Sequence, residues 1–450
     1  MKIIETYRLR ENALSTWRDS LSDQQQKCLA KAKYQKDDED RFFPGNKNRD
    51  HFCLKIKKLK NLKDEEDIKF SVESSYFIGV QWLVKDELPI FVYPKTDSKN
   101  NGKELDYFKI LFEALNNVES IDHIKQLVHI DFEQPPILIE QQQDLVTPLL
   151  VVQYLHLLKE IVRKGLKRSY YKVSRNLNTK VKGKILVSQT IKKNHARQKM
   201  LKSFCSYEEF GFDHKENRLL KKAFLFGIKY LHQLKHTNTD LTQVEDIIRY
   251  IRPAFYSVGT EVDIRELKSF KPNPLFKEYN DALSLAMSIL KRFGYNITNT
   301  ENTKLETPPF WIDMSKLFEL YVLKLLKERY HAKVLYQLTT YGNALDYLIT
   351  EDKREMVVDA KYKLKYIELN GKKHEDIRQV SGYARLKKVY NYLKNKEYPD
   401  SIDCLIIYAD QENGEANLMN DDKMKSKPID AYHGVYKIGV KLPMISKQDK

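Results

Sequence analysis

The sequence has little cysteine and no long apolar run. Its four cysteines match neither a metal-ligand motif nor a disulfide framework: Cys28, Cys53, Cys205 and Cys404. The most apolar stretch, residues 148–158, is too short to cross a membrane. Glu5 interrupts the apolar start of the chain, so no secretory signal is recognised there. These absences argue against structural zinc and predict a soluble, cytoplasmic protein that makes no membrane contact.

Acidic charge is also scarce relative to basic charge. The formal net charge is +16, which indicates a polyanionic partner such as DNA. In residues 161–203 every charged side chain is basic. Two other readings stay open, a docking surface for an acidic partner protein and a merely solvated surface. The candidate DNA-binding residues in and beside this run are Lys167, Arg168, Lys172, Arg175, Lys182 and Lys184.

The length of 450 residues predicts two or three domains, and the hydrophobic content of 42% is sufficient for packed cores. Alternating runs at residues 52–57, 68–84 and 88–93 predict a β-rich domain over residues 1–150, assigned to partner docking. Residues 151–300 are predicted to be mainly helical and contain the basic run. Residues 301–450 form the third predicted domain, so the expected fold class is α+β and multidomain.

The third domain contains the most informative pattern. Residues 341–363 predict two strands joined by a charged turn, with one acid inside each apolar run, Asp346 and Asp359. Strand alternation places Asp359 and Lys361 on the same face. In a chain this rich in lysine and acids, an Asp-x-Lys tripeptide alone carries little weight. The context carries more, because charges in buried strands are costly unless they pair or coordinate a metal.

These residue types suit phosphodiester chemistry. Two neighbouring carboxylates repel each other, and a hard cation relieves that repulsion by taking oxygen ligands. The predicted ligands are Asp346, Asp359 and the backbone carbonyl of Ala360, with Mg²⁺ as the expected ion and Mn²⁺ as its alternative. Such a metal lowers the pKa of a bound water. Lys361 would orient that water or neutralise the phosphate.

Flanking elements add further candidates. Residues 310–330 have helical periodicity, and Glu319 falls on the apolar side, as a catalytic-site residue or as a side chain at the edge of the core. Residues 375–393 predict a helix with Gln379 and Tyr383 on one face. Gln379 is a catalytic candidate and Tyr383 a DNA-binding candidate. Strands are expected near residues 332–338 and at 403–409, which together favour a mixed α/β nuclease core.

Asp346 and Asp359-Ala360-Lys361 resemble the active-site motif of PD-(D/E)XK nucleases, although Leu345 stands where the motif name places a proline. The wider chain resembles the McrC family, the nuclease subunit of McrBC-type modification-dependent restriction systems, and its LlaJI-type relatives. The resemblance extends over most of the chain. Its segments are Ile78-Gly79, Val92 to Lys95, Val181 to Ile185, Tyr207 to Phe210, Asn217 to Lys221, Leu317 to Val322, Asp359 to Lys363, and Gln379 with Tyr383.

The resemblance implies a restriction-endonuclease-like C-terminal core that hydrolyses DNA, together with an McrB-like AAA+ GTPase partner. The chain has no G-x-x-x-x-G-K-[ST] loop with which to supply that motor itself. Double-strand cleavage needs two cuts, so a hetero-oligomer with two nuclease copies is expected. A non-catalytic adaptor that docks on and stimulates the GTPase, and a standalone nuclease, are the alternatives.

Overall fold

A computed structural model describes residues 6–10, 21–31, 41–43, 52–59, 69–94, 103–116, 127–131, 133–140, 146–234, 242–262, 277–296, 304–364, 371–393 and 400–446. The chain divides into two compact units. Residues 1–149 and 301–450 form the first, and residues 150–300 form the second. The protein is of mixed α and β structure with several sheets. The two outer segments, predicted as separate domains, therefore share one compact unit.

In the first unit, a five-stranded sheet joins the two ends of the chain. β14 comes from the C-terminal segment and lies between two strands of the N-terminal segment. Gly79 of β5 makes this pairing close, because its φ is 155° and an added Cβ would lie 2.0 Å from the carbonyl oxygen of Phe310. In order, the strands are β1 (Tyr7–Arg10), β6 (Leu88–Tyr93), β5 (Phe77–Val84), β14 (Phe310–Asp313) and β8 (Val128–Ile130).

Smaller elements strengthen the same connection. β13 (Lys304–Thr307) pairs with β9 (Ile137–Glu140), and β20 (Met444–Ser446) pairs with β7 (Lys103–Leu105). The ammonium of Lys324 lies 2.9 Å from the Glu113 carboxylate of helix α2 (Tyr107–Asn116). The remaining N-terminal elements are α1 (Asp23–Lys31), β2 (Arg41–Phe43), β3 (Leu54–Leu59) and β4 (Lys69–Ser74).

A second five-stranded sheet of the first unit contains the predicted motif. The first two strand pairings are antiparallel, and the last two are parallel. The parallel step from the third to the fourth strand requires a crossover, which two helices provide. The strands in order are β15 (Val334–Thr340), β16 (Asn343–Ile349), β17 (Met356–Leu364), β18 (Asp403–Ala409) and β19 (Val435–Val440). The helices of this segment are α9 (Met314–Tyr330), α10 (Gly371–Tyr383), α11 (Lys387–Tyr392) and α12 (Asp421–Met424).

Two predicted helices differ from the observed ones. The first four residues of the segment 310–330 form β14, because Asp313 ends the strand and caps α9 by accepting a hydrogen bond from the Lys316 N–H. The segment 375–393 contains two helices, α10 and α11, that are separated after Tyr383. Val380 of α10 and Val389 of α11 both pack into the core on one side of the sheet. Both helices therefore contribute to one core despite the break between them.

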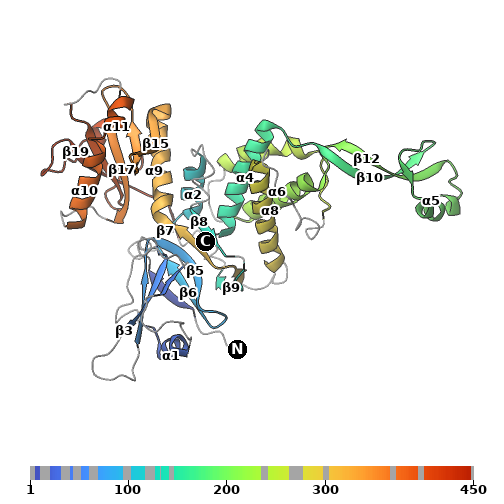
Figure 1. The fold of residues 1–450 in the computed structure, drawn as a ribbon, viewed down its shortest axis with the longest axis horizontal. Coiled ribbons are helices and arrows are strands. Elements are labelled where there is room, and N and C mark those ends of the chain that lie inside the picture. The colour runs from blue at the N-terminus through green and yellow to red at the C-terminus, as the bar shows by residue number, and fades with distance from the viewer. Residues whose placement is uncertain are drawn as a thin grey trace. The chain divides into compact units, whose positions relative to one another are not determined.

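The second unit consists of four main helices and a β ribbon. The helices are α4 (Val146–Lys164), α6 (Lys215–Leu234), α7 (Thr242–Ile251) and α8 (Lys277–Asn296). β10 (Ser169–Asn178) and β12 (Lys202–Gly211) form a long antiparallel ribbon that leads away from α4, α6 and α8 (Figure 1). β11 (Lys184–Ile185) and α5 (Val187–Lys193) lie toward its far end. The expectation of a mainly helical region missed this ribbon, which we call the arm (residues 169–211).

In the part of the chain described here, no helix has the length and apolar character that crossing a membrane requires.

Candidate functional site

The two acids of the predicted motif lie where the strand pairing opens. β16 and β17 pair from Ile349 opposite Met356 to Tyr347 opposite Val358, so Asp346 and Asp359 come next. The Oδ2 atom of Asp346 accepts a hydrogen bond of 2.9 Å from the Ala360 N–H. The Asp346 carboxylate thus accepts from a backbone N–H of β17 beside the point where the strand pairing opens. Ala360 itself is buried between Asp359 and Lys361.

The strand on the other side of Asp346 is irregular too. β15 pairs with β16 at Tyr336 and again at Leu338, and Gln337, which lies between them, has a φ of 50°. A residue other than glycine is disfavoured in this left-handed region. Such local strain is concentrated at functional sites, where the surrounding structure maintains it. Both neighbours of β16 therefore depart from regular pairing beside Asp346.

Lys361 connects Asp359 to helix α10. Its Nζ atom lies 3.1 Å from Oδ1 and 3.0 Å from Oδ2 of Asp359, but only the Oδ1 contact has hydrogen-bond geometry. The same Nζ donates to Oε1 of Gln379 at 3.0 Å. The amide of Gln379 then donates to the Tyr383 hydroxyl at 2.8 Å. The structure therefore brings four of the predicted residues into one continuous chain of contacts.

Burial dominates the electrostatics of this cluster. It raises the pKa of Asp359 to about 7, with the charge of Asp346 adding to the effect. Burial also raises the pKa of Asp346, against the opposing hydrogen bond from the Ala360 N–H. Burial alone would lower the pKa of Lys361, but the charge and hydrogen bond of Asp359 outweigh it and the net shift is upward. The ionised forms of the two carboxylates are thus poorly stabilised, while Lys361 keeps its positive charge.

Glu319 lies on α9 and is electrostatically coupled to Asp346. Burial raises its pKa to about 7, and the charge of Asp346 contributes next. Its carboxylate is 3.0 Å from the ammonium of Lys316, one turn earlier in the helix. The Tyr347 hydroxyl donates to the Glu319 backbone carbonyl at 2.6 Å, which attaches this turn of the helix to β16. The sequence placed Glu319 on the apolar face of this helix. In the structure its carboxylate is half-buried and pairs with Lys316.

The residues present are compatible with a hard divalent cation. Oδ2 of Asp359 is buried, and no donor among the described residues completes a hydrogen bond to it. Within the described ranges, no group of three or more His, Cys, Asp or Glu side chains is arranged to hold a metal. Mg²⁺ commonly uses only one or two protein carboxylates and completes its coordination with waters and substrate oxygens. Asp346, Asp359 and a backbone carbonyl are therefore a suitable donor set.

Sequence reasoning did not single out two further charged pairs at this site. Lys316 lies three residues before Glu319, and helical spacing could have revealed that pair. Asp376 is buried on α10 and accepts a hydrogen bond of 2.5 Å from Lys363 of β17. Asp376 also contributes to the raised pKa of Asp359. No local pattern pairs residues 363 and 376, since the contact depends on the crossover.

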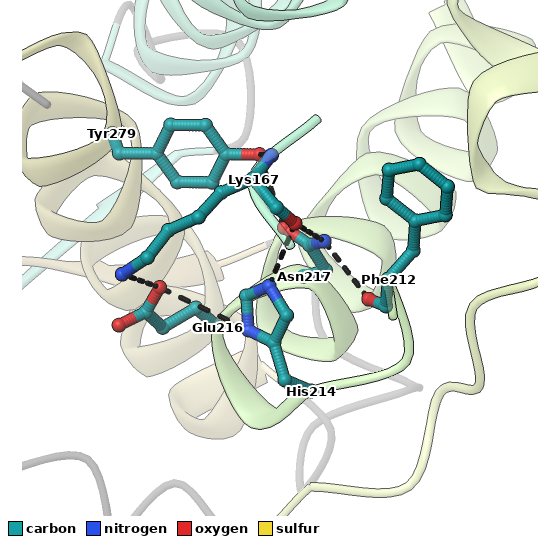
Figure 2. Close-up of polar contacts among 6 residues, drawn as sticks. All are labelled: Lys167, Phe212, His214, Glu216, Asn217 and Tyr279. Atoms are coloured by element: carbon teal, nitrogen blue, oxygen red, sulfur yellow. Dashed lines mark hydrogen bonds and ion pairs between the residues drawn. The ribbon is translucent and has the colours of Figure 1, made fainter. Parts of the chain in front are cut away.

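In the second unit, Lys167 belongs to an internal polar network at the base of the arm (Figure 2). Its ammonium donates to Glu216 at 2.8 Å. Its backbone carbonyl accepts hydrogen bonds from His214 and Asn217, at 2.9 and 3.0 Å. Asn217 also donates to the Phe212 carbonyl, so both ends of the arm are held to the start of α6. Lys167 is thus mostly buried and paired with Glu216, and its predicted contact with DNA stays a prediction.

The other predicted basic residues are exposed. The Arg168 guanidinium lies over the ring of Phe212, and Lys182 lies over Tyr207, with centroid distances of 4.6 and 4.2 Å. Lys182 is also 3.6 Å from Glu209, across the ribbon. The remaining candidates, Lys172, Arg175 and Lys184, are exposed on β10 and β11. Arg168 directly precedes the arm and the other four lie in it, so all five are in the second unit, whereas Tyr383 is in the first.

A family model, described as McrBC 5-methylcytosine restriction system component, matches residues 77–398. The chain belongs to this family. No curated protein matches the chain. The match covers the motif strands, α9 and α10, together with the whole second unit. Membership therefore applies to the site and the arm alike.

Among solved structures, the chain is similar to one chain of a refined half-complex from a tetradecameric assembly of Thermococcus gammatolerans McrB AAA+ hexamers with bound McrC. The identity is 16%, the match covers 97% of this chain and 94% of that one, and the TM-score is 0.39. A second match is to the cryo-EM structure of the Thermococcus gammatolerans McrBC complex, with 16% identity, 74% and 89% coverage, and a TM-score of 0.28. The site geometry described above rests on this chain's own residues.

Proposed function

We propose that this McrBC-family chain is the metal-dependent DNA endonuclease subunit of a restriction system. The observation that carries the proposal is the opened β16–β17 pairing, with Asp346 and Asp359 at the opening and Lys361 bound to Asp359. Buried acids with raised pKa values are typical of functional sites rather than of structural strands. We also propose that the sheet formed by β15 to β19 is the core of a restriction-endonuclease-like domain.

Asp346, Asp359 and the Ala360 carbonyl would hold Mg²⁺, which supplies a water of lowered pKa and positive charge near the scissile phosphate. Lys361 is placed to donate to a phosphate oxygen or to orient the attacking water. Gln379 holds the Lys361 ammonium from the side of α10, and Glu319 lies on the side of α9. In hydrolysis the water oxygen bonds to phosphorus and its proton passes to solvent, while the bond from phosphorus to one sugar oxygen breaks and that oxygen takes up a proton from solvent.

The arm is the proposed docking element for a partner. Six large apolar side chains between residues 181 and 201 of the arm are exposed, among basic residues that include Lys182 and Lys184. They are Val181, Ile185, Val187, Ile191, Met200 and Leu201. Phosphate contacts need charge but not exposed apolar surface, whereas protein interfaces combine both. We therefore propose an AAA+ GTPase of the McrB type as the occupant, with a hetero-oligomer containing two nuclease copies as the active assembly.

The DNA alternative for the arm assigns phosphate contacts to Arg168, Lys172, Arg175, Lys182 and Lys184. Two sets of substitutions distinguish the alternatives. Replacing Val187 and Leu201 by serine should abolish GTPase stimulation and partner binding while the affinity of the free chain for DNA is retained. Replacing Lys172 and Arg175 by alanine should then leave DNA affinity nearly unchanged. The opposite pattern would assign the arm to DNA.

The nuclease proposal is tested by plasmid cleavage with Mg²⁺, using the chain with and without its AAA+ partner and GTP. Wild type is compared with Lys361→Ala, and Lys425→Ala, which loses an ion pair with Asp403, serves as the control. Cleavage that needs partner and GTP, and that only Lys361→Ala abolishes, is the expected result. GTPase stimulation without any cleavage by wild type would instead favour a non-catalytic adaptor, and cleavage by the chain alone a standalone nuclease.

A further inference from the structure

The hairpin turn between β15 and β16 contains a residue that its geometry disfavours. Thr340 pairs with Asn343, so Tyr341 and Gly342 form a two-residue loop. Their φ values are 46° and 80°, and both are positive, as in a type I′ turn. Asn, Asp or Gly is preferred at the first of these positions, because a bulky side chain is strained there. Tyr341 nevertheless occupies it and is 76% exposed.

An exposed tyrosine is unremarkable where the backbone tolerates it, but this one combines strain with exposure. Natural sequences break a local rule mainly at functional positions. Gly342, the second turn residue, has no atom near the place an added Cβ would take, so packing does not explain the turn. The Tyr341 side chain is therefore available to contact something outside the described chain.

The surroundings of the turn identify the chemistry of that contact. Lys388 of α11 donates to the Thr339 carbonyl at 2.9 Å, two residues before Tyr341. The corner that joins α10 to α11 presents Arg385 and Lys387 as exposed side chains. From Ile377 to Lys396 the sequence contains no acid. An exposed aromatic ring on a strained backbone, beside a corner whose charged side chains are all basic, is suited to bind a polyanion. The ring itself is suited to contact sugars or bases.

The turn also lies on the appropriate side of the proposed active site. Because β16 and β17 are antiparallel, the residues before Asp346 run alongside those after Asp359, toward Lys361. Tyr341 lies five positions before Asp346, which is at most about 17 Å along the chain. At a rise of about 3.4 Å per base pair, the turn therefore lies within the length of about five base pairs of the proposed active site.

We propose that Tyr341 and the basic α10–α11 corner (Arg385, Lys387 and Lys388) form a contact for duplex DNA beside the cleavage site. Tyr341 is a positioning residue that holds the duplex in register with Asp346 and Asp359. This inference rests on the proposed nuclease function. It differs from the docking role of the arm, which belongs to the other unit.

The decisive variant is Tyr341→Asn, since Asn-Gly is the preferred sequence for a type I′ turn. Relief of the backbone strain should raise the Tm by about 2 °C. Loss of the ring should raise KM for DNA cleavage by the full chain with its partner about tenfold, equivalent to 1.4 kcal/mol, with kcat nearly unchanged. Tyr341→Phe, which keeps the ring, should retain the wild-type KM. Met419→Asn, another exposed apolar side chain in a loop, is the matched control and should change neither value.

The basic corner has its own signature. Lys387→Ala should reduce the salt dependence of DNA affinity, with the slope of log K against log[salt] falling by about 0.9 for one lost phosphate contact. Affinity is measured by fluorescence anisotropy with a labelled 30-base-pair duplex and no added metal. An unchanged KM in a stabilised Tyr341→Asn variant would overturn the inference while leaving the nuclease proposal intact. A change in partner binding or self-association at normal KM would assign the turn to a protein contact and overturn it as well. Absence of cleavage by wild type would instead count against the nuclease proposal.

Discussion

Replacing Asp359 by asparagine should stabilise the protein without metal. Asp359 is 1% exposed, and burial raises its pKa from 3.8 to about 7. A folded-state pKa above the unfolded one gives stability that is complete below the lower value and lost as pH rises through the upper one. In EDTA, the free energy of unfolding of wild type should therefore fall between about pH 4 and pH 7. The asparagine variant, which cannot ionise at this position, should lose the part of the dependence that comes from Asp359, while Glu319 and Asp346 keep theirs.

The magnitude follows from the same values. At about 1.4 kcal/mol per pH unit, ionisation between pH 3.8 and about 7 costs the folded state at most about 4 kcal/mol at pH 8. The pKa of about 7 already includes the favourable contact between the Asp359 carboxylate and the Lys361 ammonium, so that contact is not subtracted again. The expected stabilisation is therefore up to about 4 kcal/mol, or roughly a 10 °C rise in Tm at pH 8. At pH 5 the gain should be smaller, about 2 kcal/mol, because only the unfolded acid, with its pKa of 3.8, is ionised there.

The assay is thermal unfolding at pH 5, 6.5 and 8, in EDTA and in 10 mM Mg²⁺. Bound metal stabilises the folded state by mass action, so Mg²⁺ should raise the Tm of wild type at pH 8 and leave Asp359→Asn unchanged. The control is Asp403→Asn, which should keep the Mg²⁺ response. Asp403 lies on the neighbouring strand β18 and pairs with Lys425. A variant less stable than wild type at pH 8 in EDTA, or one with an undiminished Mg²⁺ response, would refute the reasoning.

Three further predictions concern other parts of the chain. Lys361→Ala should lower the cleavage rate by about 100-fold or more, because it removes the positive charge beside the phosphate. A circular dichroism spectrum like that of wild type would exclude misfolding. Retained cleavage would contradict the assignment of Lys361 to the active site. Asn217→Ala should destabilise the second unit by about 2 kcal/mol, because it removes the Asn217 hydrogen bond to the Phe212 carbonyl and one of the two donors to the Lys167 carbonyl. Urea unfolding and proteolysis at the arm base would report the loss, and an unchanged midpoint would speak against it. Gly79→Ala should destabilise the first unit by about 3 kcal/mol or more, because its Cβ would lie 2.0 Å from the Phe310 carbonyl oxygen; Gly165→Ala, where no atom lies within 4 Å of the added Cβ, is the comparison for urea unfolding.

Local patterns in the sequence were sufficient for the motif strands. Alternation and apolar runs predicted strands around Asp346 and Asp359 and at residues 403–409, where β16, β17 and β18 lie. Spacing by two placed Lys361 on the side of Asp359, and spacing by four placed Gln379 beside Tyr383. Such relations are local, because a strand or helix sets the direction of each side chain from its position alone.

Relations between distant segments were not available from these patterns. The arm was missed because β10 is largely exposed and most residues of β12 are only partly buried, so no run of buried apolar side chains marks these strands. Lys167 resembled its basic neighbours in sequence, and only the packing of α6 against the base of the arm gave it Glu216 as a partner. β14 was read as part of a helix, because its apolar residues gain their strand partners from β5 and β8 more than 170 residues away.

The sequence by itself therefore determined the charge, the family resemblance and the local alternation that places acid and lysine together. Tertiary structure alone decided which carboxylates are buried, and so which pKa values rise, because desolvation depends on everything packed around a group. It also decided where the strand pairing opens and which apolar side chains of the arm are exposed. Those properties belong to neighbours in space, which the order of residues along the chain does not specify.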